Sequence, residues 1–394
     1  MSHDLPHFEP RSGSTWRDPF GMYAALRDRD PVHHVAEGDY WVLSRFADVF
    51  AAARDTATFS SAQGLTFGYG EIDAAGLGDA TPMVFLDPPE HTEFRRLVAR
   101  GFTPRRVADL ELQVRDFVVE RVDRLRAAGG GDIVADLFKP LPSMVVAHYL
   151  GVPQADRTRF DGWTDAIVAA NAAGDAMATP DAVAELFEYF SHLIERRRRE
   201  PGEDTISHLV AAADDGQPVP VLRILGFAFT MVAGGNDTTT GLLGGSAELL
   251  TDRRDQRDLL LEDPMRIPDA VDELLRLTSP VQGLARTSTR DVTVEDTVIP
   301  EGRKVLLLYA SANRDPRTFG DDAEELRVER RPGQIMSFGY GAHHCLGAAV
   351  ARLVARVTLE ELLTRCPRFT VDAALGEFAS GNYVRRYQAL PFTP

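Results

Sequence analysis

The segment from Val219 to Leu250 constrains the fold more than any other part of the chain, because it is apolar on nearly every side of a helix. As one helix it would extend roughly 48 Å, enough to cross a whole domain. A helix that is apolar all round is buried in a core. Its middle, from Gly234 to Thr240, reads G-G-N-D-T-T-T, and these residues have poor helix propensity. We expect this local weakness to have a functional reason.

Helical periodicity dominates the rest of the chain. Apolar residues recur at helical spacing, between Pro, Gly and Asp residues, in segments 107–127, 183–199 and 346–365. Short strand-like segments occur at 33–42, 292–299, 305–309 and 369–371. The 394 residues include no linker-like stretch. We therefore expect a mainly α chain: a single large helical domain over 1–394 with small peripheral β-sheets, with a short N-terminal extension at about 1–17.

Charge and cysteine content exclude several classes of protein. The chain has 43 basic and 59 acidic residues, a net charge of −16, which argues against nucleic acid and anionic membrane surfaces as partners. The first thirty residues contain no apolar run long enough for a signal peptide or membrane anchor, so a cytoplasmic location is expected. The two cysteines, Cys345 and Cys366, form no C-x-x-C pair, which excludes a disulfide framework and the common zinc and iron–sulfur ligand sets.

The segment from Phe338 to Gly347 reads F-G-Y-G-A-H-H-C-L-G and directly precedes a helical pattern. Glycines permit positive φ and a close approach of the backbone to a flat ligand. A helix N-terminus directs N–H groups and positive potential toward a thiolate. We therefore expect Cys345 to stay deprotonated. A lone buried cysteine is more often a small apolar core residue, but the spacing of Phe, Gly, His and Cys argues against that interpretation.

This segment resembles the haem-binding signature of the cytochrome P450 superfamily. Further family landmarks follow in order from about Asp18 to Arg386, and the sequence is most similar to soluble actinobacterial members, especially mycobacterial ones. The resemblance implies the P450 fold, with the long helix crossing over haem b, and a monooxygenase that uses O₂. It also implies that Cys345 ligates the iron, which favours O–O cleavage. Haem contacts are implied for Phe338, Gly339, His343 and Gly347 of the signature, and for His91, Arg95 and Arg286.

The same resemblance implies a structural role for a pair of charged residues. Glu273 and Arg276 lie three positions apart on one helix face, where a solvated ion pair is the usual explanation. By resemblance they are the family's Glu-x-x-Arg pair, a buried structural clamp. The run A-N-R-D-P from Ala312 to Pro316 resembles the segment whose arginine commonly completes the clamp network.

Asp237 and Thr238 place a carboxylate beside a hydroxyl in the middle of the expected central helix. A desolvated acid there is costly. The alternative is a surface-facing Asp237 next to a Thr238 that bonds back to its own helix. The resemblance implies instead that the pair is the catalytic dioxygen-activation site, with Asp237 relaying protons and Thr238 holding the oxygen species.

Substrate contacts are the least constrained part of the sequence. Residues 64–82 are rich in glycine, which indicates either a lid or a surface excursion. By their place in the family fold, the following residues are substrate candidates, each with core packing as its alternative: Phe67, Tyr69, Ile167, Asn171, Phe229, Ala233, Leu284 and Val384. The substrate is expected to be a small, largely apolar molecule.

The chain has no room for a flavin or iron–sulfur module, so electrons are expected from separate redox proteins. The resemblance implies that these are a ferredoxin and its NAD(P)H-dependent reductase. An acidic ferredoxin would dock on arginines that cluster in this fold: Arg95, Arg96, Arg100, Arg105, Arg106, Arg352 and Arg356. Two alternatives remain. A peroxide-driven peroxygenase is disfavoured by the Asp237–Thr238 pair, and a non-catalytic haem sensor or carrier would have no use for a costly buried proton relay.

Overall fold

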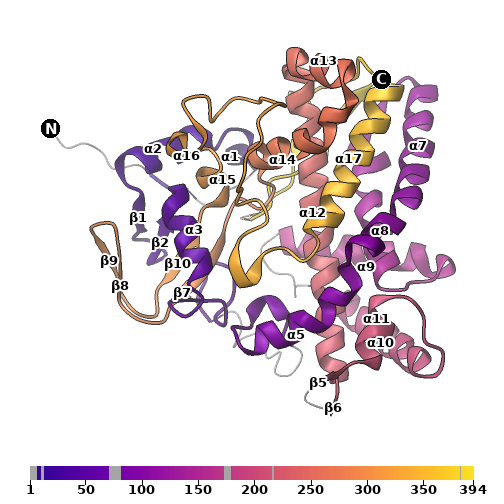
Figure 1. Ribbon diagram of the computed structural model, residues 1–394, viewed down its shortest axis with the longest axis horizontal. Helices are drawn as coiled ribbons and strands as arrows, with labels where there is room; N and C mark the ends of the chain where they lie inside the picture. The colour runs from indigo at the N-terminus through magenta and orange to yellow at the C-terminus, as the bar shows by residue number, and fades with distance from the viewer. Residues whose placement is uncertain (1–6, 10–12, 71–80, 173–178, 215–216, 382) are drawn as a thin grey trace.

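A computed structural model of the chain describes residues 7–9, 13–70, 81–172, 179–214, 217–381 and 383–394. Long helices fill one side of the molecule, and the larger sheet and several short helices fill the other (Figure 1). Helix α12 (Val221–Asp252) runs through the helical side next to α17 (Ala348–Arg365). The expected long central helix and the small sheets are therefore confirmed.

The remaining helices differ from the predicted segments mainly at their ends. The segment expected at 107–127 is divided at Leu110 into α6 and α7. The α-helices are α1 (Gly13–Arg17), α2 (Phe20–Arg29), α3 (Phe46–Arg54), α5 (Glu90–Val98), α6 (Pro104–Asp109), α7 (Glu111–Ala128), α8 (Pro140–Tyr149), α9 (Arg157–Ala172), α10 (Pro180–Arg199), α11 (Thr205–Ala211), α13 (Arg254–Glu262), α14 (Ile267–Thr278), α15 (Tyr309–Ala312) and α16 (Pro316–Phe319). Short 3₁₀ or π turns are η2 (Met83–Phe85), η3 (Ala99–Phe102), η4 (Val134–Phe138), η5 (Gln154–Asp156), η6 (Pro264–Arg266) and η7 (Gly341–His343).

The largest sheet has five strands in the order β1-β2-β10-β7-β3, with β10 parallel to β2 and the other pairs antiparallel. Its strands are β1 (Val32–Val35), β2 (Tyr40–Leu43), β3 (Phe59–Ser60), β7 (Leu284–Ser288) and β10 (Lys304–Leu307). The segment expected at 33–42 is thus a hairpin, and Tyr309 belongs to α15 instead of the strand. The smaller sheets contain β4 (Gly131–Asp132), β5 (Ala213–Asp214), β6 (Gln217–Pro218), β8 (Val292–Val294), β9 (Thr297–Ile299), β11 (Thr370–Val371), β12 (Glu377–Phe378), β13 (Tyr387–Ala389) and β14 (Pro391–Thr393).

Helix α12 contributes to two apolar clusters. Leu242 and Leu243 pack in one with residues of α7, α14 and α17, and Ile224 and Phe227 pack in the other with residues of α5, α9 and α10. Burial on most sides explains why this helix persists despite its weak centre. Among the described residues, none of the helices combines the length and apolar character that a membrane crossing requires.

Part of the expected N-terminal extension is packed against the body of the protein. Trp16 of α1 is fully buried, and its carbonyl oxygen accepts a 2.6 Å hydrogen bond from Arg385 Nε. Arg17 donates to the hydroxyl of Tyr387 at 3.1 Å. Residues 13–17 therefore belong to the folded body and hold the C-terminal hairpin.

Candidate active site

The loop before α17 presents the thiol of Cys345. The N–H of Cys345 donates to the carbonyl oxygen of Phe338 at 2.8 Å, which closes the loop on itself. Gly339 and Gly341 have φ values of +62° and +70°, which strongly favour glycine. A Cβ on Gly341 would also lie 2.8 Å from the carbonyl oxygen of Ala53, so the loop fits closely against α3. Gly347, at the start of α17, has an ordinary negative φ, and a Cβ there would approach the Cys345 sulfur at 3.9 Å.

The electrostatics of Cys345 differ from the sequence expectation. The Cys345 side chain is exposed to solvent, yet many protein atoms lie around its sulfur. The desolvation that these atoms cause raises the pKa of the thiol. The N–H of Gly347 and the charges of Arg95 and Arg352 lower the pKa without cancelling that effect. The expectation that the polypeptide alone keeps Cys345 deprotonated is therefore wrong. Coordination to a metal would remove the proton, because a ligating thiol is deprotonated outright.

Four donor side chains from three elements meet at this loop: His91 and Arg95 of α5, Arg286 of β7, and His343 of η7. The rings of His91 and His343 are 4.2 Å apart. Burial, followed by the charges of Arg286, His91 and Arg95, lowers the pKa of His343 to about 3. His91 is buried, and within the described residues neither of its ring nitrogens has a hydrogen-bond partner.

Such a cluster of donors fits an anionic ligand. Burial, followed by the charge of Arg95, lowers the pKa of His91, so both histidines are neutral at pH 7 and the positive charge comes from the arginines. Buried donors without partners are costly unless a ligand satisfies them. Two carboxylates would receive charge-assisted hydrogen bonds here. The chemistry of these residues, with a free thiol alongside, therefore fits the two propionates and the iron of haem b.

The middle of α12 combines an unbroken helix with an open side. Thr238 Oγ1 donates to the carbonyl oxygen of Gly234 at 3.0 Å, and Thr239 Oγ1 donates to that of Gly235 at 3.2 Å. These back-bonds let threonine occupy a helix interior. A Cβ on Gly234 would have nothing within 4 Å, although the rest of the helix is largely buried. The weak-propensity residues thus create space along the helix without breaking it.

Asp237 points into the protein. Its side chain is only 6% exposed and its Oδ1 lies 2.6 Å from Arg386 Nε. Burial raises the pKa of Asp237 to about 6, and Arg386 and then Lys139 oppose that rise. The alternative of a surface-facing Asp237 is therefore wrong. The hydrogen bond from Thr238 to its own helix, which that alternative also predicted, is present. Arg386 was not identified from the sequence, because a basic residue near the C-terminus carries no local sign of a partner in α12.

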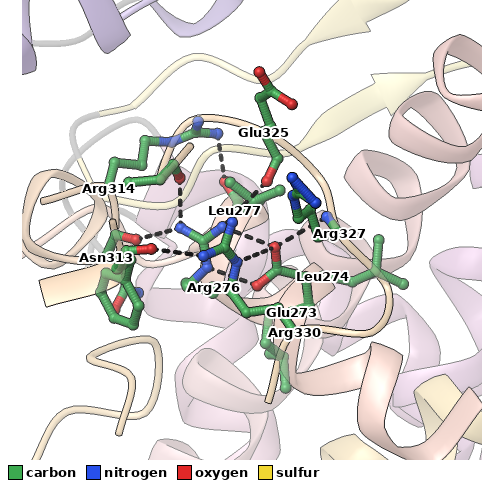
Figure 2. A network of polar contacts seen from close by, with 12 residues as sticks. Glu273, Leu274, Arg276, Leu277, Asn313, Arg314, Glu325, Arg327 and Arg330 are labelled. Atoms are coloured by element: carbon green, nitrogen blue, oxygen red, sulfur yellow. Dashed lines mark hydrogen bonds and ion pairs between the residues drawn. The ribbon is translucent and has the colours of Figure 1, made fainter. Parts of the chain in front are cut away.

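The Glu273–Arg276 pair is completely buried, which excludes the solvated pair (Figure 2). Arg276 donates from Nε and Nη2 to the two carboxylate oxygens of Glu273 at 2.7 and 2.8 Å. Its Nη1 donates to the carbonyl oxygens of Asn313 and Ala323 at 2.7 and 2.6 Å. The clamp therefore joins α14 to two distant segments of the chain.

The arginine that completes the clamp differs from the one in the A-N-R-D-P run. Arg330 Nε donates to Glu273 Oε1 at 3.1 Å. Arg314, from the run itself, bonds instead to the carbonyl oxygen of Leu277 and to Glu324 (Figure 2 shows Arg314 and Arg330 on opposite sides of Arg276). Sequence reasoning missed Arg330, because nothing local connects it to a glutamate 57 positions away.

The substrate candidates fall into four groups. Ile167 is fully buried in an apolar cluster, so its core-packing alternative is favoured. Tyr69 is tied to the large sheet, since its hydroxyl donates to the carbonyl oxygen of Asp39 at 2.6 Å and accepts from the N–H of Lys304 at 3.1 Å. The side chain of Asn171 lies outside the described residues, as does 71–80 of the glycine-rich segment. The half-buried apolar candidates are Phe67, Phe229, Ala233, Leu284 and Val384.

Comparison with known proteins gives a consistent result. The family model for cytochrome P450 matches residues 249–373. Cytochrome P450 130 of Mycobacterium tuberculosis is 63% identical over 400 residues, covering 100% of this chain and 98% of the relative. Vitamin D(3) 25-hydroxylase of Pseudonocardia autotrophica is 35% identical, covering 97% and 95%. The solved structure of CYP109E1 from Bacillus megaterium in complex with testosterone has a TM-score of 0.85 and 31% identity, covering 95% and 99%.

Replacing Arg276 by methionine should lower the apparent free energy of unfolding by about 3–5 kcal/mol, because a buried carboxylate loses its main partner. Urea unfolding monitored by circular dichroism measures this change. Arg331→Ala serves as the control, since it removes an exposed partner of Asp269 on the same helix and should cost less than about 1 kcal/mol. Equal losses in the two variants would contradict the clamp.

Proposed function

The chain belongs to the cytochrome P450 family and is a haem b monooxygenase, and on that premise we propose how its residues serve the reaction. Cys345 would ligate the iron, and His91, Arg95, Arg286 and His343 would hold the propionates. Bound haem supplies the redox-active iron at which O₂ is reduced and one oxygen atom passes to the substrate. The observation that carries this assignment is the accessible thiol at the start of α17 beside four buried or half-buried donors.

Asp237 and Thr238 would deliver the protons that O₂ reduction consumes. Asp237 is buried with a pKa near neutrality, at about 6, so it can both accept and release a proton at physiological pH. The Thr238 hydroxyl is adjacent in the chain and borders the open side at Gly234. A peroxygenase or a passive haem carrier would not need this buried acid, so the monooxygenase is the function that the geometry supports best.

The substrate would be a small, largely apolar molecule. Phe229 and Ala233 lie on α12 just before the open side, and Phe67, Leu284 and Val384 come from three other segments; all five are half-buried. Half-buried apolar side chains provide the lining that is typical of ligand sites. A relative named for vitamin D(3) and a similar structure that holds testosterone make sterols the first class to test.

Electrons would come from an acidic ferredoxin with its NAD(P)H-dependent reductase, in a cytoplasmic setting. Arg96, Arg100 and Arg105 are exposed and have no ion-pair partner among the described residues. Arg106, Arg352 and Arg356 are instead paired with Glu203, Asp272 and Glu111, respectively. Arg96 lies on α5, which also carries His91 and Arg95, and Arg100 and Arg105 follow in η3 and α6. Together they would give a chain with a net charge of −16 a local basic patch near the proposed haem site.

Cys345→Ser should abolish the thiolate-type absorption spectrum of the reduced, carbon-monoxide-treated protein, because serine does not replace the iron–sulfur bond. Cys366→Ser is the matched control, since Cys366 is buried and lies at the C-terminal end of α17, whereas the signature loop precedes the N-terminal end. It should keep the thiolate spectrum. An unaltered spectrum in Cys345→Ser would refute the ligand assignment.

Thr238→Ala should reduce product formation by about 10²-fold, the lower end of what positioned proton transfer contributes. NADPH consumption should continue, with hydrogen peroxide as its product. Both are measured with a steroid that shifts the haem spectrum, such as testosterone. Thr239→Ala removes the neighbouring back-bonded hydroxyl and should leave the ratio of product to NADPH unchanged. The relay is contradicted if the two variants behave alike.

Arg100→Glu should raise the apparent KM for an acidic [2Fe–2S] ferredoxin several-fold at low salt, because it reverses an exposed charge at the proposed docking patch. The difference from wild type should shrink as ionic strength increases. Arg199→Glu makes the same charge change at the exposed end of α10 and should have no effect. Equal KM values for both variants would exclude the patch.

A further inference from the structure

Arg386 forms an ion pair that none of the roles above uses. It precedes β13 in the C-terminal segment, and its Nε lies 2.6 Å from Oδ1 of Asp237 in the middle of α12. The side chains are 11% and 6% exposed, so the pair is largely withdrawn from water. Ion pairs in such surroundings are screened far less than surface pairs. A charge at this distance acts strongly on the acid.

The backbone around Arg386 is fixed on both sides. Gln282 donates from its N–H to the carbonyl oxygen of Tyr383, and Arg385 donates to that of Pro280, each at 2.8 Å. The N–H of Ala379 donates to the carbonyl oxygen of Arg386 at 3.0 Å. The guanidinium of Arg386 is therefore carried by a segment with few ways to move.

A glycine in α12 allows this segment to approach the helix. Gly241 lies one turn after Asp237 on the same helix face. A Cβ on Gly241 would come within 2.6 Å of the carbonyl oxygen of Arg385 and 3.4 Å of Arg386 Cβ. Without a side chain at this position, the C-terminal segment can lie close enough for Arg386 to reach the acid.

Few other charges act on Asp237. Within the described residues, Arg386 is the one cation at ion-pair distance from it. Lys139 acts from farther away, and its Nζ is already 3.0 Å from Asp165 Oδ1 at a half-exposed site. The ionisation of Asp237 is thus governed by two opposing influences, its burial and Arg386.

We propose that Arg386 is a positioning residue that holds Asp237 in place as a carboxylate and thereby sets the pH range in which protons are delivered. The proposal rests on the relay role of Asp237 proposed above. In each cycle the carboxylate accepts a proton from water and releases it toward the Thr238 hydroxyl, which restores the carboxylate. A carboxyl group with a higher pKa holds its proton more tightly and releases it less readily toward Thr238.

The direction of the effect follows from the charges. Burial raises the pKa of Asp237 to about 6 against the lowering by Arg386. Removing the positive charge leaves burial unopposed, so the pKa must rise further. An opposite charge at this range shifts a carboxyl pKa by about 1–3 units. Asp237 would then keep its proton through much of the neutral range, and release of that proton toward the Thr238 hydroxyl would be less favourable.

The test is the pH profile of product formed per NADPH consumed by the haem-loaded enzyme. In wild type this ratio should change with pH through a midpoint near pH 6. Arg386→Gln, which keeps the length and loses the charge, should move that midpoint up by about 1–3 pH units. Arg386→Lys should restore a midpoint near that of wild type. A profile of Arg386→Gln that superimposes on wild type would overturn the proposal.

Asp237→Asn separates this proposal from the relay itself. If Asp237→Asn keeps full coupling, the relay role fails. If Asp237→Asn loses coupling while Arg386→Gln does not, the relay holds and the role of Arg386 is refuted. Should Arg386→Gln not fold, infrared spectra of wild type and Arg386→Lys provide the readout. The carboxyl band missing from Asp237→Asn should titrate near pH 6 in both, and titration near the ordinary value of about 4 would reject the proposal.

Discussion

The buried ion pair between Glu273 and Arg276 is the contact on which the geometry of the site depends. Arg276 binds the carbonyl oxygen of Asn313, and the side chain of Asn313 in turn accepts from the N–H of Met336 at 2.6 Å and donates to Ser337 Oγ at 2.9 Å. Ser337 directly precedes the cysteine loop. Two charges in α14 therefore fix the start of the segment that presents the thiol, and removing one charge leaves the other buried without its main partner.

Helix α12 meets two opposing requirements in one element. Its ends are apolar and pack into separate clusters, which supplies the stability of a core helix. Its centre uses glycine and threonine to open space and to place a carboxylate where water is scarce. Tertiary packing at both ends compensates for the poor helix propensity between them.

The sequence predicted the parts of this protein that depend on local patterns. Periodicity identified the helices at 180–199, 221–252 and 348–365 closely, and the cysteine signature led to the family, the haem and the class of enzyme, all now confirmed. Prediction from the sequence failed where residues that are distant in the chain determine an ion pair or a pKa. The partners Arg330 and Arg386 come from far along the chain, and the pKa of Cys345 depends on the protein packed around it. The division of α6 from α7 at Leu110 also escaped a pattern that is continuous in sequence.

The packing of residues 13–17 against the C-terminal hairpin affects the order in which the molecule can be assembled. Arg385 is bonded to Trp16, and its neighbour Arg386 reaches the acid of α12. Segments that are far apart in the sequence therefore come together around the carboxylate and its partner. During synthesis on the ribosome, α12 and the cysteine loop emerge before Arg386, so the proton path can be completed only after the segment next to β13 has emerged.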